Sequence, residues 1–123
     1  MDKKRILVVE DEPDYMMALT IRLSVAGYEV IQATDGLQGY ALAKRERPDL
    51  ILLDIMLPKM DGFKVCRLLK FDANYSSIPI LMLTARGMEE DLKLGSEVGA
   101  DGYLTKLIDP KTLIENIEAL LHR

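Results

Sequence analysis

Three uninterrupted runs of four apolar residues recur along the chain and constrain its fold more than any other feature. The runs are Ile6–Val9, Leu50–Leu53 and Ile80–Leu83. Their length is typical of strands, and the lack of polar alternation indicates burial on both faces, as in a parallel sheet covered by helices. Val30–Ile31 and Tyr103–Leu104 are shorter or mixed, so we expect them at the edges of the same sheet.

Helical patterns fill the intervals between these runs. The residues that mark five helices are Met16, Leu19 and Leu23; Leu37, Tyr40 and Ala41; Phe63, Cys66 and Leu69; Leu92, Leu94 and Val98; and Leu113, Ile114, Ile117, Leu120 and Leu121. Gly27 and Gly99 are expected to end the first and fourth helices, and Pro48 stops the second. Asp109 and Pro110 suit the N-cap and first residue of the fifth helix.

Strict alternation of strand and helix predicts an α/β fold with a doubly wound five-stranded parallel sheet, (βα)5. We expect one domain over residues 1–123, since neither a linker nor a repeat interrupts the pattern. The last predicted helix reaches the end of the sequence, so we expect no effector domain after it.

Composition narrows the class of protein. Hydrophobic residues make up 49% of the chain, which is enough for a sizeable core. The net charge of −4 argues against nucleic acid as a direct partner, because phosphate backbones are held by clustered Lys and Arg. Cys66 is the only cysteine and suits a buried thiol in a reducing compartment. Neither a signal peptide nor a run of membrane-spanning length is apparent, so the predicted location is cytoplasmic, without a membrane partner.

Chemically active side chains follow the strands. Glu10 and Asp11 come after Ile6–Val9, Asp54 after Leu50–Leu53, Thr84 after Ile80–Leu83, and Lys106 shortly after Tyr103–Leu104. The carboxyl ends of parallel strands meet at one edge of the sheet, where the functional crevice of such folds lies. Taken singly, each residue is an ordinary cap or turn residue. Their occurrence at every relevant strand end indicates a functional site.

Clustered carboxylates at this edge repel one another, and either protonation or a bound cation relieves the repulsion. Their hard oxygen atoms suit Mg²⁺. Asp54 can then attack phosphorus and form an aspartyl phosphate. Lys106 and the Thr84 hydroxyl would neutralise and orient the phosphoryl oxygens.

Several short motifs extend beyond these single residues. They are Val8–Pro13, Pro48–Leu50, Asp54–Pro58, Met60–Gly62, Pro79–Ile80, Thr84–Ala85, Gly99–Tyr103 and the isolated Lys106. Together they resemble the receiver domain family of two-component response regulators over essentially the whole chain. The resemblance implies a flavodoxin-like fold with strand order 2-1-3-4-5.

The same resemblance implies roles for the site residues. Asp54 would be the phosphoacceptor, and Asp11 would ligate Mg²⁺ directly, together with Asp54 and the Met56 carbonyl. Glu10 would act on the metal through water. The residues implied to bind the phosphoryl group are Thr84, Ala85, Lys106 and Met56. Thr84 and Tyr103 resemble the family's switch pair, in which the hydroxyl moves toward the phosphate and the aromatic ring turns inward.

The implied function is a signalling switch rather than an enzyme, although it would assist its own phosphorylation and slow autodephosphorylation. The donor would be a sensor histidine kinase, a phosphotransfer protein or a small phosphodonor. A downstream protein target would read the change. Both a stand-alone receiver and a receiver fragment of a larger regulator fit the sequence.

Two departures from the family pattern stand out. The family usually has a proline, often after a cis bond, where this chain has Leu107. A cis bond before leucine costs roughly 2.5–4 kcal/mol, so we expect a trans Lys106–Leu107 bond with the ammonium still close to Asp54. Gly102 and Asn116 replace an acid and an arginine typical of the winged-helix subfamily, so that subfamily's salt-bridged dimer is not expected.

Two other functions share parts of this pattern. A phosphatase with an aspartate nucleophile commonly has a second acid two residues after it, where this chain has Met56. A flavin binder on the same fold needs a phosphate-cradling loop rich in Ser, Thr and Gly after the first strand. The acids Glu10 and Asp11 stand there instead and would repel a phosphate.

Overall fold

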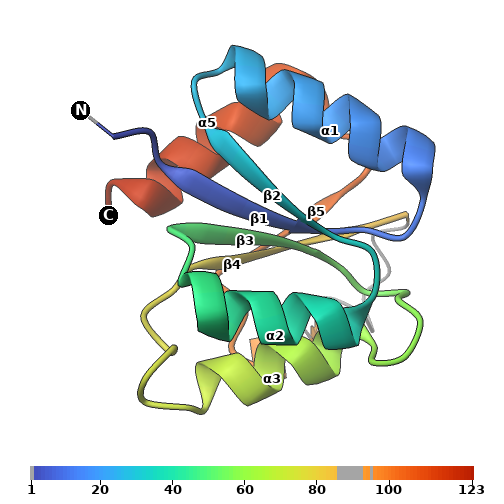
Figure 1. Ribbon diagram of the computed structural model, residues 1–123, viewed down its shortest axis with the longest axis vertical. Coiled ribbons are helices and arrows are strands. Elements are labelled where there is room, and N and C mark those ends of the chain that lie inside the picture. Colours follow the sequence, from blue (N-terminus) through green and yellow to red (C-terminus); the bar gives the residue numbers. More distant parts are fainter. Residues whose placement is uncertain (1, 86–92, 95) are drawn as a thin grey trace.

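The computed structural model describes residues 2–85, 93–94 and 96–123, which form a five-stranded sheet between two helical layers (Figure 1). The strands are β1 (Arg5–Val9), β2 (Glu29–Ala33), β3 (Leu50–Asp54), β4 (Ile80–Thr84) and β5 (Gly102–Thr105). The helices with defined bounds are α1 (Pro13–Val25), α2 (Gly36–Glu46), α3 (Gly62–Lys70) and α5 (Pro110–Leu121).

The sheet has the order β2-β1-β3-β4-β5, and every neighbouring pair is parallel. This order confirms the one implied by the family resemblance, and it places the two weaker strands, β2 and β5, at the edges as expected. The register pairs Val9 with Leu53, Asp54 with Leu83, and Thr84 with Thr105. The strand ends that carry polar residues therefore lie side by side along one edge.

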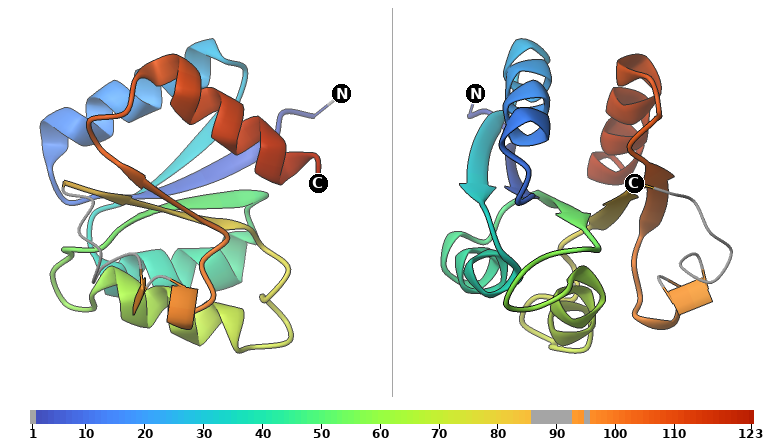
Figure 2. Two further views of the ribbon diagram at one scale, coloured as in Figure 1. Left: turned by 180° about the vertical axis from the view of Figure 1, so that it is seen from behind. Right: turned by 90° about the vertical axis from the view of Figure 1, so that its right-hand side faces the viewer.

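Helices cover both faces of the sheet, with α1 and α5 on one side and α2 and α3 on the other (Figures 1 and 2). Because side chains alternate along a strand, Ile6 and Val8 pack in the core beneath α1 and α5. Leu7 and Val9 pack in the core above α2 and α3. Burial on both faces accounts for the uninterrupted apolar runs.

The predicted helix boundaries agree with the backbone. Asp109 caps α5 by accepting a hydrogen bond from the Thr112 N–H, and Pro110 is the first helical residue. Gly27 follows α1 with a φ of +98°, which glycine adopts without steric cost. The described helices are 9 to 13 residues long, and none is long and apolar enough to cross a membrane.

Of the residues that mark the predicted fourth helix, Leu92 lies outside the described residues, and Leu94, which was expected on the apolar face, is 43% exposed. Val98, which was expected on the same face, is buried, and Gly99 has a φ of +87°.

Cys66 on α3 is fully buried, as the sequence suggested. Burial raises the pKa of its thiol to about 12. The Sγ atom lies 3.6 Å from the Val98 carbonyl oxygen, to which it donates. The thiol is therefore a packing group of the core.

The expected apolar face of α2 is right for Tyr40, which packs against the core, and wrong for the other two residues. Leu37 is 52% exposed and Ala41 is exposed, whereas Gly36, Gly39 and Ala43 are buried. A Cβ atom on Gly39 would lie 2.8 Å from the methyl carbons of Val9. The helix therefore packs on β1 through Gly39, because a residue without a Cβ atom allows the backbone to approach the sheet closely.

Candidate functional site

Three carboxylates meet at the carboxyl edge of the sheet. Glu10 and Asp11 follow β1, and Asp54 is the last residue of the neighbouring β3. One oxygen from each lies within 4.8 Å of those of the other two, and we call this group the acidic cluster. Glu10 and Asp54 are buried, whereas Asp11 is exposed. The cluster therefore has a buried floor and one side open to solvent.

The Lys106 ammonium lies inside the acidic cluster. Its Nζ atom is 2.5 Å from Glu10 Oε1 and 3.0 Å from Asp54 Oδ2. The Lys106–Leu107 bond is trans, so the expectation of a trans bond with the ammonium near Asp54 is confirmed. Lys106 reaches the cluster without the family's proline, since its flexible stem adapts to the backbone.

Backbone groups hold the remaining carboxylate oxygens. The Glu12 N–H donates to Glu10 Oε2 at 2.9 Å, and the Ile55 N–H donates to Asp54 Oδ1 at 2.8 Å. Gly62 closes the loop below Asp54, where a Cβ atom would lie 2.0 Å from the Asp54 carbonyl oxygen. Both buried carboxylates are thus oriented before any ligand arrives.

Charge in the acidic cluster is unevenly balanced. Burial raises the pKa of Glu10, and the negative charge of Asp54 raises it further. Hydrogen bonds from Lys106 and Glu12 lower the pKa of Glu10 but do not cancel this increase. Burial would lower the pKa of Lys106, but its hydrogen bonds to Glu10 and Asp54 outweigh burial and raise it. The ammonium is therefore held in its charged form, as a cation within the cluster.

The acidic cluster fits a divalent metal of the Mg²⁺ type. Its donors are all hard carboxylate oxygens from three residues, close enough to converge on one ion. The carboxylates outnumber the single ammonium, so a further cation would relieve the remaining repulsion.

The other predicted site residues differ in burial. Thr84 is buried at the end of β4, and its carbonyl oxygen accepts from the Lys106 N–H at 2.7 Å. Ala85 follows it and is exposed, and Met56 is 72% exposed two residues after Asp54. Tyr103, on the edge strand β5, is half-buried and packs toward the α2–α3 side of the sheet.

One neighbour of the site was missed in the sequence. Tyr15 lies in the first turn of α1, and Lys106 Nζ is 4.7 Å from the centroid of its ring. An aromatic residue just inside the helix that follows Glu10 and Asp11 was the available signal. Nothing in the spacing alone links it to a lysine 91 positions later, and this contact depends on the fold.

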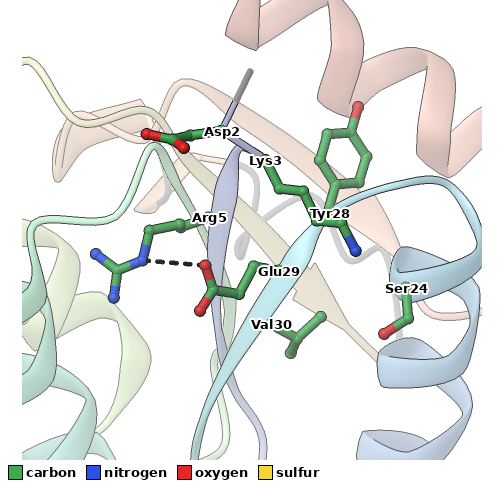
Figure 3. Close-up of a pocket in the computed structure, with 7 residues that line it drawn as sticks. All are labelled: Asp2, Lys3, Arg5, Ser24, Tyr28, Glu29 and Val30. Atoms are coloured by element: carbon green, nitrogen blue, oxygen red, sulfur yellow. Dashed lines mark ion pairs between the residues drawn. The ribbon is translucent and has the colours of Figure 1, made fainter.

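A separate hollow of about 570 Å³ lies at the opposite end of the strands, beside the starts of β1 and β2 (Figure 3). Its lining residues are Asp2, Lys3, Arg5, Ser24, Tyr28, Glu29 and Val30. Arg5 and Glu29 form an ion pair there at 3.7 Å. The acidic cluster, at the other end of the strands, remains the place where three carboxylates and an ammonium converge.

Comparisons with known proteins agree with this geometry. The family model for the response regulator receiver domain matches residues 6–118. The chain is 43% identical over 117 residues to protein PilH of Pseudomonas aeruginosa, covering 95% of this chain and 97% of that protein. The receiver domain of the sensor histidine kinase PA1611 from the same species superposes with a TM-score of 0.92 at 30% identity, covering 99% of this chain and 100% of that one.

A longer relative is the DNA-binding dual master transcriptional regulator RpaA of a Synechocystis species. It is 49% identical over 119 residues, which are 97% of this chain but only 49% of RpaA. The chain thus spans about half the length of such regulators and nearly all of PilH. With the family model, the strand order and the strand-end residues in agreement, the chain belongs to the receiver domain family of two-component response regulators.

Proposed function

We propose that Asp54 accepts a phosphoryl group in a Mg²⁺-dependent reaction and that the aspartyl phosphate changes the binding of a downstream protein. The observation that carries this proposal is the position of Asp54. It is buried at the end of β3, belongs to the acidic cluster, and pairs with Lys106 at 3.0 Å. A carboxylate between a cation site and an ammonium suits attack on phosphorus better than a structural role.

Asp11 and Asp54 would hold the metal directly, with Glu10 acting through water and the Met56 carbonyl completing the protein ligands. The convergent oxygens of the acidic cluster support this assignment. The PA1611 receiver domain has a magnesium ion coordinated in its active site cleft, which supports the choice of metal. Bound there, Mg²⁺ would supply positive charge that screens the carboxylates and the phosphoryl oxygens.

The reaction would proceed by displacement at phosphorus. A carboxylate oxygen of Asp54 attacks, a new O–P bond forms, and the bond from phosphorus to the donor's nitrogen or oxygen breaks. The bonding electron pair leaves with the donor. Lys106, the Thr84 hydroxyl and the Ala85 N–H would balance the charge on the phosphoryl oxygens. Attack of water on phosphorus would later break the bond from the Asp54 oxygen to phosphorus, release inorganic phosphate and return the free carboxylate, which gives slow autodephosphorylation in place of turnover as an enzyme.

Thr84 and Tyr103 would transmit the change. They lie on the adjacent strands β4 and β5, where Thr84 ends its strand and Tyr103 pairs with Met82. Movement of the Thr84 hydroxyl toward a phosphoryl group would vacate space on the side of β5. Tyr103, which lies on that edge, would then change the surface that a partner reads.

The donor would be a sensor histidine kinase or a phosphotransfer protein in the cytoplasm. Apolar side chains of α1 beside the acidic cluster support docking of a protein donor, since Met17 and Ile21 are 62% and 57% exposed. Both line a hollow that also reaches Glu10 and Asp11. We propose neither nucleic acid nor a membrane as a direct partner of this domain. The same switch would serve a stand-alone protein or a larger regulator.

Intact-mass measurement tests the proposal. Incubation with Mg²⁺ and acetyl phosphate should add one phosphoryl group to the chain, and transfer from candidate histidine kinases should add the same group. Asp54→Asn should abolish both, because an amide is not a competent nucleophile. Asp61→Asn is the matched control, since Asp61 caps α3 and asparagine caps equally well. Stoichiometric labelling of Asp54→Asn would overturn the assignment.

A further inference from the structure

Tyr15 contacts the site without belonging to the acidic cluster. It comes from the first turn of α1, whereas Lys106 follows β5 at the far edge of the sheet. The Tyr15 ring is partly buried against the core beneath α1 and α5. The Lys106 ammonium lies 4.7 Å from the ring centroid, within the range of cation–π attraction.

Among the described residues, the Lys106 ammonium thus has three partners, of which the ring alone takes no part in the proposed chemistry. Glu10 and Asp54 are a proposed metal ligand and the proposed phosphoacceptor, so their contacts with Lys106 must change when the site is used. The ring offers a neutral, preformed surface that competes with neither. It can therefore keep the ammonium at the site while the carboxylates exchange partners.

Among the described residues, the loop after β5 makes few other contacts that restrain the Lys106 side chain. The Lys106 backbone N–H is fixed by the Thr84 carbonyl oxygen. Leu107, in the place of the usual proline, is 89% exposed and anchors nothing in the core. The long stem of a lysine has many rotamers, and a half-buried ring beside it restricts them.

We propose that Tyr15 is a positioning residue that holds the Lys106 ammonium over the acidic cluster through its ring. The role in phosphorylation rests on the proposed function of Asp54, but the positioning itself does not. The ring, not the hydroxyl, is the acting group, so phenylalanine serves in its place and leucine does not.

The first test observes Lys106 in the unphosphorylated chain. In proton–carbon-13 correlation spectra of labelled lysine, the Lys106 Hε signals should lie upfield because of the ring current, with Lys106→Met used for assignment. Tyr15→Leu should move them to the position of exposed lysines, and Tyr15→Phe should leave them in place. Tyr40→Leu is the matched control, because Lys44 lies 4.8 Å from the Tyr40 ring, remote from the acidic cluster. Tyr40→Leu should shift the Hε signals of Lys44 and leave those of Lys106 in place.

The second test measures the rate of labelling by acetyl phosphate. Tyr15→Leu should slow it by about threefold to tenfold, as expected for loss of one cation–π contact, whereas Tyr15→Phe and Tyr40→Leu should match the wild type. In a Lys106→Met background, Tyr15→Leu should have no further effect. This coupling separates an effect through the lysine from a general loss of structure.

The outcomes separate the two proposals. Identical Lys106 signals in the wild type and Tyr15→Leu overturn the positioning role, whatever the labelling shows. Equal slowing by Tyr15→Leu with and without the lysine also overturns it. Absence of labelling in the wild type overturns the function proposed for Asp54 and leaves the spectra to decide the role of Tyr15.

Discussion

At the scale of single residues, Asp101 is the most heavily bonded carboxylate away from the site in the part of the chain that the structure describes. It accepts hydrogen bonds from Lys70 Nζ at 2.7 Å, from the Ile80 N–H at 2.8 Å and from Arg123 at 2.6 Å. The side chains of Lys70 and Asp101 are 9% and 11% exposed. The group ties the end of α3 to the starts of β4 and β5, opposite the acidic cluster.

Asp101→Asn should therefore destabilise the fold by about 3 kcal/mol at neutral pH, because it leaves the buried Lys70 charge unpaired. Urea unfolding measures the loss. Arg123→Ala removes only a half-exposed partner and should cost less than about 1 kcal/mol. Equal effects of the two variants would contradict this account of the buried pair.

The pH dependence of the same variant has a definite sign. Burial opposes ionisation of Asp101, but hydrogen bonds from Lys70, Ile80 and Arg123 outweigh it and lower the pKa below the ordinary 3.8. A lowered pKa stabilises the fold above the unfolded value, and this stability is lost as the pH falls through the folded value. The difference between wild type and Asp101→Asn should thus shrink below about pH 4. A difference that stays constant well below pH 4 would contradict this account.

At the scale of elements, the contact of α2 with β1 depends on Gly39. Alanine is the better helix former by about 1 kcal/mol, yet a Cβ atom there would meet Val9 at 2.8 Å. Overpacking costs about 1–3 kcal/mol, so Gly39→Ala should destabilise the fold by roughly 1 kcal/mol in urea unfolding. In a Val9→Ala background the clash is relieved, and the same substitution should become neutral or stabilising. Stabilisation in the wild-type background would refute the close contact.

At the scale of the whole molecule, we expect the acidic cluster to make the stability of the fold depend on cations. Mg²⁺ that binds the folded chain alone should stabilise it by about 2.7 kcal/mol at a hundredfold excess over Kd. The thermal midpoint should rise accordingly and fall again with a chelator. Asp11→Ala should remove most of the rise, whereas Asp14→Asn, a control at an exposed position one turn away, should keep it. A midpoint insensitive to Mg²⁺ would count against the metal site.

Local pattern was enough to predict much of this protein. The uninterrupted runs predicted the inner strands, the weaker runs predicted the edges β2 and β5, and Asp109 with Pro110 predicted the start of α5. Because parallel strands end at one edge, the sequence also predicted that Asp54 and Lys106 would meet, as their 3.0 Å contact confirms.

Tertiary structure decided the contacts that join elements far apart in the chain. Periodicity reports which face of one helix is apolar, and it pointed to Leu37, but the separation of α2 from β1 made the small Gly39 the buried residue. The pairing of Tyr15 with Lys106 and of Lys70 with Asp101 likewise has no local signature. Such contacts depend on the distance and orientation of two packed surfaces, and these exist only once the sheet and its helices have assembled.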